Sequence, residues 1–139
     1  MFEAIDNVTM INESTGAFPD AAHRPARRWP GAVLQGQYPL VLDALQAAGA
    51  AWHTAAPCLR PRLCIDLYDA TCADELPSAQ NIYNELKPLV GFIVAGELAT
   101  TVKVGQGLRG ARVGGSRRPL LPLGDGSRAA LKKLLTYVQ

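Results

Sequence analysis

Short apolar runs alternate with a helix-like stretch in the first half of the chain, and this alternation constrains the fold most. Residues 7–11 (NVTMI), 32–35 (AVLQ) and 50–56 (AAWHTAA) have the composition of buried strands. Between the last two, residues 39–48 place apolar side chains at helical spacing and stop at Gly49. Buried strands that alternate with helices are typical of parallel β/α units. The sequence therefore predicts an α/β fold.

The second half of the chain predicts helices only. The strongest apolar stripe lies in residues 78–94 and continues across Pro88. The other expected helices cover residues 61–73, 98–109 and a final stretch that Asp125 or Ser127 caps. Three strands by themselves leave a sheet with two exposed edges, which folded proteins avoid. We therefore expect this chain to form part of a larger structure.

Length and charge exclude several classes of function. A chain of 139 residues forms one compact domain at most. Its net charge of +2 is too small to indicate binding of nucleic acid or of an anionic membrane. No apolar run reaches the ~18 residues that a membrane span requires. Neither nucleic acid nor membrane is therefore an expected partner.

The cysteines indicate a reducing compartment. Cys58, Cys64 and Cys72 contain no CxxC spacing and cannot all pair within the chain. The N-terminus has no pattern of a secretory signal, so we expect reduced thiols in a cytoplasmic protein. Neither His23 nor His53 stands at zinc-ligand spacing from a cysteine, and no metal site is predicted.

Five motifs in the same order carry a resemblance to a known family. They are NVTMINESTG, AVLQGQYPLVLDALQAAGA, LRPRLCIDLYDA followed by LPSAQNIYNELKPL, TTVKVGQGLRG and RRPLLPL. Together they resemble the C-terminal half of the dihydrodipicolinate synthase / N-acetylneuraminate lyase family, which comprises class I pyruvate aldolases. Each motif is weak alone, whereas five in order over residues 7–135 make the resemblance specific.

The resemblance implies a partial TIM barrel with a helical C-terminal extension. Residues 1–60 would supply the last three β/α units, with strands six to eight, and residues 61–139 the last barrel helix and the extension. A complete barrel needs about 250 residues, so about half is absent. The implied partner is a separate N-terminal half-barrel chain or, since members commonly form dimers or tetramers, another copy of the chain.

The family's catalytic lysine is the first position where the chain departs from the pattern. That lysine condenses with the keto group of pyruvate, and the resemblance places Asn12 there. A carboxamide nitrogen is delocalised into its carbonyl and cannot form the imine, although it can donate a hydrogen bond to a bound carbonyl. The chain's four lysines all lie beyond residue 86, and we expect Lys103 to be a surface or packing lysine. Glu13, next to Asn12, is expected to orient the site or stabilise it.

Other expected substrate-binding positions depart as well. After the second strand the chain has Gly36 and Tyr38 in the stretch QGQY, where the family has a serine, a glycine and acidic or amide residues. In the third segment Thr54 stands for a serine and Cys58 for an asparagine. Trp52 replaces a small glycine and would fill space that substrate or backbone normally occupies.

A new site built from these departures is an alternative. His53, Cys58 and Tyr38 would all lie near the carboxyl ends of strands, where barrels carry out chemistry. A Cys/His nucleophilic pair is therefore conceivable. A histidine on an apolar strand is more often a hydrogen-bonded core residue, and a lone cysteine more often a small apolar one.

The function that we expect is that of a degenerate aldolase-family half-barrel. Without the lysine it would be a non-catalytic subunit or a fragment that completes a partner, and it would bind a 2-keto acid weakly and use no cofactor. The alternative is a split pyruvate-class lyase that acts together with a separate N-terminal half by a lysine-independent mechanism.

Overall fold

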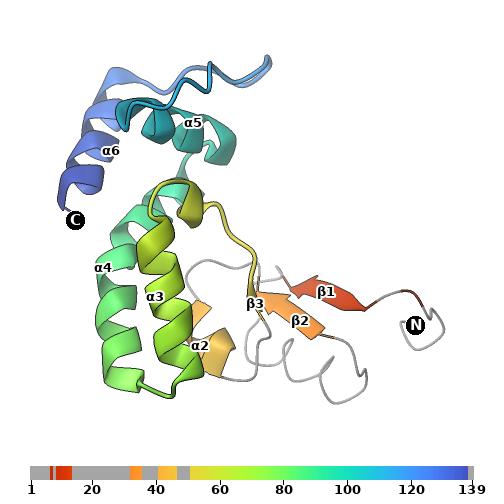
Figure 1. Cartoon of the computed structure of the whole chain (residues 1–139). Helices are drawn as coiled ribbons and strands as arrows, with labels where there is room; N and C mark the ends of the chain where they lie inside the picture. Colours follow the sequence, from red (N-terminus) through yellow and green to blue (C-terminus); the bar gives the residue numbers. More distant parts are fainter. Residues whose placement is uncertain (1–6, 8, 14–31, 36–40, 47–50, 138–139) are drawn as a thin grey trace.

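The computed structural model describes residues 7, 9–13, 32–35, 41–46 and 51–137. Among these residues three strands come first, with one helix between the second and the third, and helices follow up to Tyr137 (Figure 1). In chain order the elements are β1 (Met10–Glu13), β2 (Ala32–Gln35), α2 (Val41–Gln46), β3 (Ala51–Trp52), the 3-10 helix η3 (Ala56–Cys58), α3 (Pro61–Cys72), α4 (Leu76–Ala95), α5 (Leu98–Leu108) and α6 (Asp125–Tyr137).

The three strands form one parallel sheet in the order β1-β2-β3. Met10 of β1 pairs with Ala32 of β2, and the ladder continues to Glu13 opposite Gln35. Gln35 in turn pairs with Trp52, the last residue of β3. The carboxyl ends of all three strands are thus in register, which is the arrangement expected for consecutive β/α units.

Two of the three predicted strands have different bounds in the structure. The strand over residues 32–35 is confirmed. The first strand was expected over 7–11 but runs from Met10 to Glu13, because the ladder to β2 includes the polar residues that appeared to begin a loop. The third was expected over 50–56 but pairs only at Ala51 and Trp52 before the chain turns into η3.

The predicted helices are confirmed, with shifts of a few residues at their ends. Helix α4 extends from Leu76 to Ala95 without interruption at Pro88. Helix α6 begins at Asp125, and its Leu131 is completely buried. The ends of the helix expected over 39–48 lie outside the described residues.

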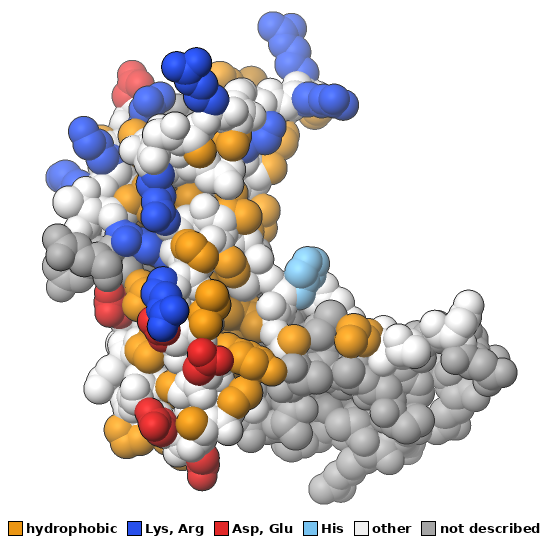
Figure 2. Space-filling model, viewed as in Figure 1, with side chains coloured by type: hydrophobic (Ala, Val, Ile, Leu, Met, Phe, Trp, Pro, Cys, Tyr) orange, Lys and Arg blue, Asp and Glu red, His pale blue; other side chains and the backbone are white. Residues whose placement is uncertain are grey.

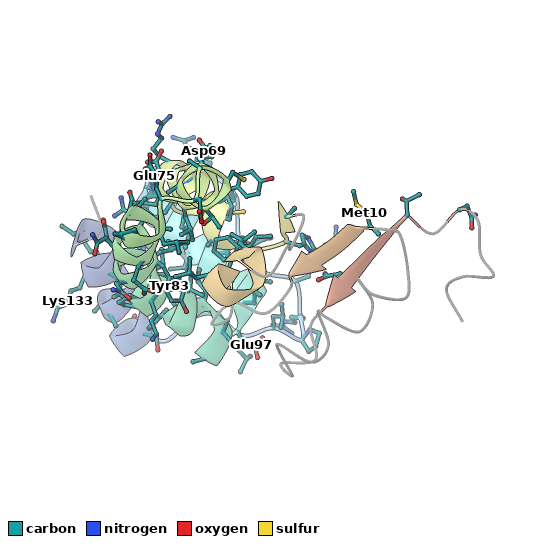
Figure 3. The ribbon with its side chains drawn as sticks, turned by 90° about the horizontal axis from the view of Figure 1, so that it is seen from below. Met10, Asp69, Glu75, Tyr83, Glu97 and Lys133 are labelled. Atoms are coloured by element: carbon teal, nitrogen blue, oxygen red, sulfur yellow. The ribbon has the colours of Figure 1, made fainter. Side chains whose placement is uncertain are left out.

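A hydrophobic core joins the helices. Helix α3 packs along α4, and α5 and α6 cover the far end of α4 (Figure 1). Tyr83 lies inside the helical part, 7% exposed, whereas β1 and Met10 lie away from the helices (Figure 3). The largest completely buried side chains are those of Leu59, Leu67, Leu86, Leu89, Ile93 and Leu131. Burial of these side chains is the main stabilising contribution, at roughly 1.5–3 kcal/mol for each.

Within the part of the chain that the structure describes, no helix has the length and apolar character needed to cross a lipid bilayer.

Candidate active site

Asn12 lies one residue before the end of β1, and its side chain contacts the segment that follows β3. The amide nitrogen Nδ2 of Asn12 is 3.0 Å from Nδ1 of His53. His53 comes directly after Trp52, and the in-register strand ends bring the two residues together although 41 positions separate them. Two of the predicted site residues therefore lie in contact at the carboxyl edge of the sheet, a contact that the sequence did not predict.

The direction of this hydrogen bond defines the histidine tautomer. An amide nitrogen can only donate, so Nδ1 of His53 accepts and its ring proton resides on Nε2. Both side chains are exposed. The pair is thus a polar, solvent-accessible contact in which one N–H of Asn12 donates to His53. It contains no amine that could attack a keto group.

Thr54 has a local structural role. Its Oγ1 accepts a hydrogen bond of 3.2 Å from the backbone N–H of Ala56, the first residue of η3. A hydroxyl in this position satisfies a donor that the short helix leaves without an internal partner. The structure thus shows Thr54 stabilising the turn that follows β3, and its contact with a substrate stays a prediction.

Cys58 and His53 belong to neighbouring segments but make different contacts. Cys58 is exposed at the end of η3, and His53 is bonded to Asn12. The Cys/His nucleophilic pair therefore stays a prediction without a hydrogen bond in the described residues to support it. Cys64 is less suited still to nucleophilic chemistry, because burial raises the pKa of its thiol to about 12.

The remaining predicted positions are described only in part. Gly36 and Tyr38 lie outside the described residues, and of Glu13 only the backbone in β1 is described. Trp52 is half-buried and packs against the hydrophobic core. Its large side chain thus contributes to core packing at this strand end.

Lys103 is remote from the strand ends, on α5. Its Nζ donates a hydrogen bond of 2.9 Å to the backbone carbonyl of Gly115. This contact agrees with the expected packing role. Among the described residues, no group of three His, Cys, Asp or Glu side chains is placed to hold a metal ion.

The sequence did not reveal the role of Arg60. Its Nη2 donates to the backbone carbonyl of Leu135, which links the start of α3 to the last turn of α6. Burial and the nearby charge of Arg109 lower the pKa of Arg60. An arginine between the buried Leu59 and the helix-starting Pro61 was the only signal, and it does not specify a partner 75 residues away.

These elements define the class of protein. Parallel strands with aligned carboxyl ends, polar residues at those ends and helices that follow them are the units of parallel α/β folds such as the TIM barrel. No family model matches the chain.

Comparison with known proteins identifies the family. The chain is 25% identical to a 4-hydroxy-tetrahydrodipicolinate synthase of Methanothrix thermoacetophila, over 95% of this chain and 45% of that protein. It is 29% identical to a DapA-like lyase of Pyrobaculum islandicum, over 97% of this chain and 50% of that protein. The chain thus spans about half the length of the curated relatives that it matches.

Solved structures agree with the sequence matches. A proposed dihydrodipicolinate synthetase from Pseudomonas aeruginosa superimposes with a TM-score of 0.93 at 35% identity, over 99% of this chain and 48% of that one. DapA-2 from Bacillus anthracis gives a TM-score of 0.90 at 23% identity, over 97% and 47% of the two chains. The curated relatives and the solved structures thus indicate the dihydrodipicolinate synthase family over this chain, which spans about half of their length, consistent with a C-terminal half.

Proposed function

We propose that this chain supplies the C-terminal half of a dihydrodipicolinate synthase-type barrel and does not carry out imine chemistry. In this proposal residues 1–60 hold barrel strands six to eight, and residues 61–139 hold the last barrel helix and the C-terminal extension. The observation that carries the proposal is the side chain at residue 12. An asparagine amide, bonded to His53 at 3.0 Å, occupies the strand end where the resemblance places the lysine.

The missing imine follows from the chemistry of nitrogen. The lone pair of a lysine amine attacks a keto carbon. The adduct then loses water and becomes a protonated imine, which withdraws electrons from the neighbouring carbon. The amide lone pair of Asn12 is delocalised, and its N–H group donates to His53. Asn12 therefore acts as a hydrogen-bond donor, and the chain would bind a 2-keto acid without activating it.

The exposed face of the sheet supports completion of the barrel by other strands. Met10 and Asn12 lie two residues apart on β1 and therefore share one face of the sheet. Both are exposed, Met10 by 58%. Inward-facing side chains of a closed barrel are packed in layers, so this face lacks its cover in the described residues. The missing strands would come from outside these 139 residues, on the same polypeptide or on a partner chain.

A second candidate function rests on the Asn12–His53 pair. Because Nδ1 of His53 accepts from Asn12, its Nε2–H remains a donor that could hydrogen-bond to a bound keto group. A completed barrel with this pair would be a pyruvate-class lyase that polarises a keto group by hydrogen bonding, without an imine. Loss of keto-acid turnover in a His53→Ala variant of the completed barrel would support this candidate.

Borohydride trapping with pyruvate tests the imine proposal. Borohydride reduces an imine to a stable amine, and mass spectrometry then detects the adduct. The wild-type chain should show no adduct, whereas Asn12→Lys should gain one if residue 12 faces the keto-acid pocket. Met10→Lys is the matched control, because it places the same amine on the same exposed face two residues earlier. This variant should gain no adduct.

Two outcomes would contradict this proposal. A pyruvate adduct on the wild-type chain would show that another amine does the chemistry. Equal trapping by the Asn12→Lys and Met10→Lys variants would show that residue 12 has no special position.

Reconstitution tests the half-barrel. The part of the Pseudomonas aeruginosa relative that this chain does not match is expressed and mixed with the full chain, and light scattering measures the mass of the complex. We expect a one-to-one complex that Met10→Asp weakens at least tenfold, because the charge would enter the barrel interior. Leu121→Asp is the matched control, since Leu121 is 74% exposed in the helical part. Equal weakening by the two variants would contradict the proposal.

A further inference from the structure

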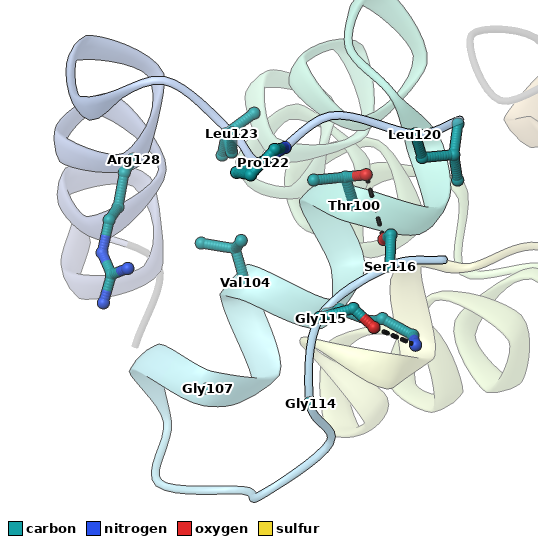
Figure 4. Close-up of a pocket in the computed structure, with 11 residues that line it drawn as sticks. Thr100, Val104, Gly107, Gly114, Gly115, Ser116, Leu120, Pro122, Leu123 and Arg128 are labelled. Carbon is teal, nitrogen blue, oxygen red and sulfur yellow. Dashed lines mark hydrogen bonds between the residues drawn. The ribbon is translucent and has the colours of Figure 1, made fainter. Parts of the chain in front are cut away.

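A second candidate site lies in the helical part, away from the strand ends. A pocket of about 320 Å³ is enclosed by α5, by the connection from α5 to α6 and by α6 (Figure 4). Its volume is at the lower end of the range for small-molecule sites. We call it the C-terminal pocket, and the lining residues that matter here are Thr100, Lys103, Val104, Ser116, Leu123 and Arg128.

One side of the C-terminal pocket offers hydrogen-bond donors. Thr100, only 3% exposed, donates from Oγ1 to Oγ of Ser116 at 3.0 Å. Ser116 accepts in this bond, so its own hydroxyl proton is available to a ligand. Lys103 uses one N–H in its bond of 2.9 Å to Gly115 and has two more. The existing bonds therefore fix these groups in place and leave three donors for an acceptor in the pocket.

The charge of the pocket is positive and uncompensated. Lys103 and Arg128 line it, and no acidic side chain does. In the described chain neither of the two makes an ion pair, the one such pair being Arg62 with Asp66. Residues 98–137 contain eight Lys or Arg residues and a single acidic residue, Asp125. Lys and Arg side chains accordingly gather over the α5 and α6 end of the face in Figure 2. Such a field attracts small anions.

The lining of the pocket also contains apolar side chains. Val104 and Leu123 are half-buried and lie with Pro122 on the side of the pocket toward α6, whereas Leu120 lies near Thr100 and Ser116 (Figure 4). A ligand that satisfies both the hydrogen-bond donors and the apolar side chains has one anionic group and a short hydrocarbon body.

We propose that the C-terminal pocket binds a small aliphatic carboxylate. The carboxylate accepts hydrogen bonds from the Lys103 ammonium and the Ser116 hydroxyl, and Arg128 adds positive charge from α6. The hydrocarbon body packs on Val104 and Leu123. This site is independent of the keto-acid chemistry at Asn12, because it uses none of the strand-end residues.

Titration of the full chain with valerate, followed by NMR of backbone amides, tests the proposal. Valerate should shift the amide signals of Gly115 and Ser116 in a saturable way, whereas valeramide, equal in shape but neutral, should not. Lys103→Met should weaken valerate binding at least tenfold. Lys132→Met is the matched control, because Lys132 is an exposed α6 lysine outside the lining, and it should bind as the wild type does.

A second variant separates binding from loop structure. Lys103 also holds Gly115, so its replacement alters the loop as well as the charge. Ser116→Ala leaves the Lys103–Gly115 bond intact, although it removes the acceptor of the Thr100 hydroxyl together with one ligand donor, and it should weaken binding severalfold. Equal responses to valerate and valeramide, no saturable shifts at Gly115 and Ser116, or equal affinity in the Lys103→Met and Lys132→Met variants would each overturn the proposal.

Discussion

The helical part and the strand part of this molecule differ in how completely each buries its own apolar side chains. In α3–α6 the large apolar side chains are buried against one another, and Leu67, Leu86 and Ile93 are completely inaccessible. On β1 the apolar Met10 is 58% exposed and lies away from the helices (Figure 3). The helices thus carry a core of their own, while the described side chains of β1, those of Met10 and Asn12, are exposed.

Truncation of apolar side chains should give the largest difference in stability between the helical part and the strand part. Leu86→Ala in α4 removes a completely buried side chain, so we expect a loss of about 2–5 kcal/mol in the free energy of unfolding. Met10→Ala on β1 should change it by less than about 0.5 kcal/mol, since little burial is lost. Denaturant melts of the two variants measure the difference. Similar losses would show that β1 is covered in the isolated chain.

A close helix approach predicts the next largest effect. A Cβ added at Gly105 of α5 would lie 2.6 Å from Cδ2 of Leu59, which is completely buried. We therefore expect Gly105→Ala to destabilise the chain by about 1–3 kcal/mol. The control is Gly91→Ala in α4, where nothing lies within 4 Å of the new Cβ, and helix propensity should stabilise it by up to about 1 kcal/mol. Thermal melts that rank the two variants in reverse would contradict the packing of α5 on Leu59.

The buried thiol of the helical part predicts a dependence on pH. Burial raises the pKa of Cys64 from 9.0 to about 12, so the folded state keeps a proton that the unfolded state releases between these values. Stability from this group is complete below pH 9 and is lost as pH rises toward 12, at about 1.4 kcal/mol per pH unit for one proton. Cys64→Ala should flatten that slope in denaturant melts.

Alkylation gives an independent measurement of the same group. At pH 8 iodoacetamide should modify the exposed Cys58 and Cys72 well before Cys64. Equal rates for all three thiols, read by mass spectrometry, would show that the helical core opens readily.

Two adjacent threonines provide the smallest and most exacting comparison. Thr101 is completely buried, and its hydroxyl has no hydrogen-bond partner in the described part of the chain, whereas Thr100 donates to Ser116. Thr101→Val should stabilise the chain by up to about 1 kcal/mol, and Thr100→Val should destabilise it by about 1 kcal/mol. Opposite signs in chemical denaturation are the expected result. A loss in both variants would mean that the Thr101 hydroxyl has a partner in solution.

The sequence predicted the order of elements because their hydrophobic periods are strong. The stripe of α4 is continuous enough to outweigh Pro88, and AVLQ is bounded by glycines on both sides. The bounds of β1 were predicted less well, since pairing with β2 includes the polar Asn12 and Glu13, and side-chain character does not report backbone pairing.

Contacts between distant residues were the part that the sequence could not supply. The resemblance placed Asn12 and His53 near strand ends, but their hydrogen bond depends on the register of three strands. The C-terminal pocket likewise depends on how the loop around Gly115 folds onto α5, which no local pattern of glycines specifies.

The two edges of the described sheet also have a consequence for assembly. All three strands point the same way, so β3 of one copy can extend β1 of the next copy only as a head-to-tail contact. The two surfaces in such a contact differ, so each added copy leaves one edge of each kind free. Copies therefore add until a ring closes or a filament grows. For the half-barrel proposed above, concentrated solutions of the chain alone should therefore form head-to-tail oligomers along the sheet, and an added N-terminal half should suppress that growth by occupying both edges.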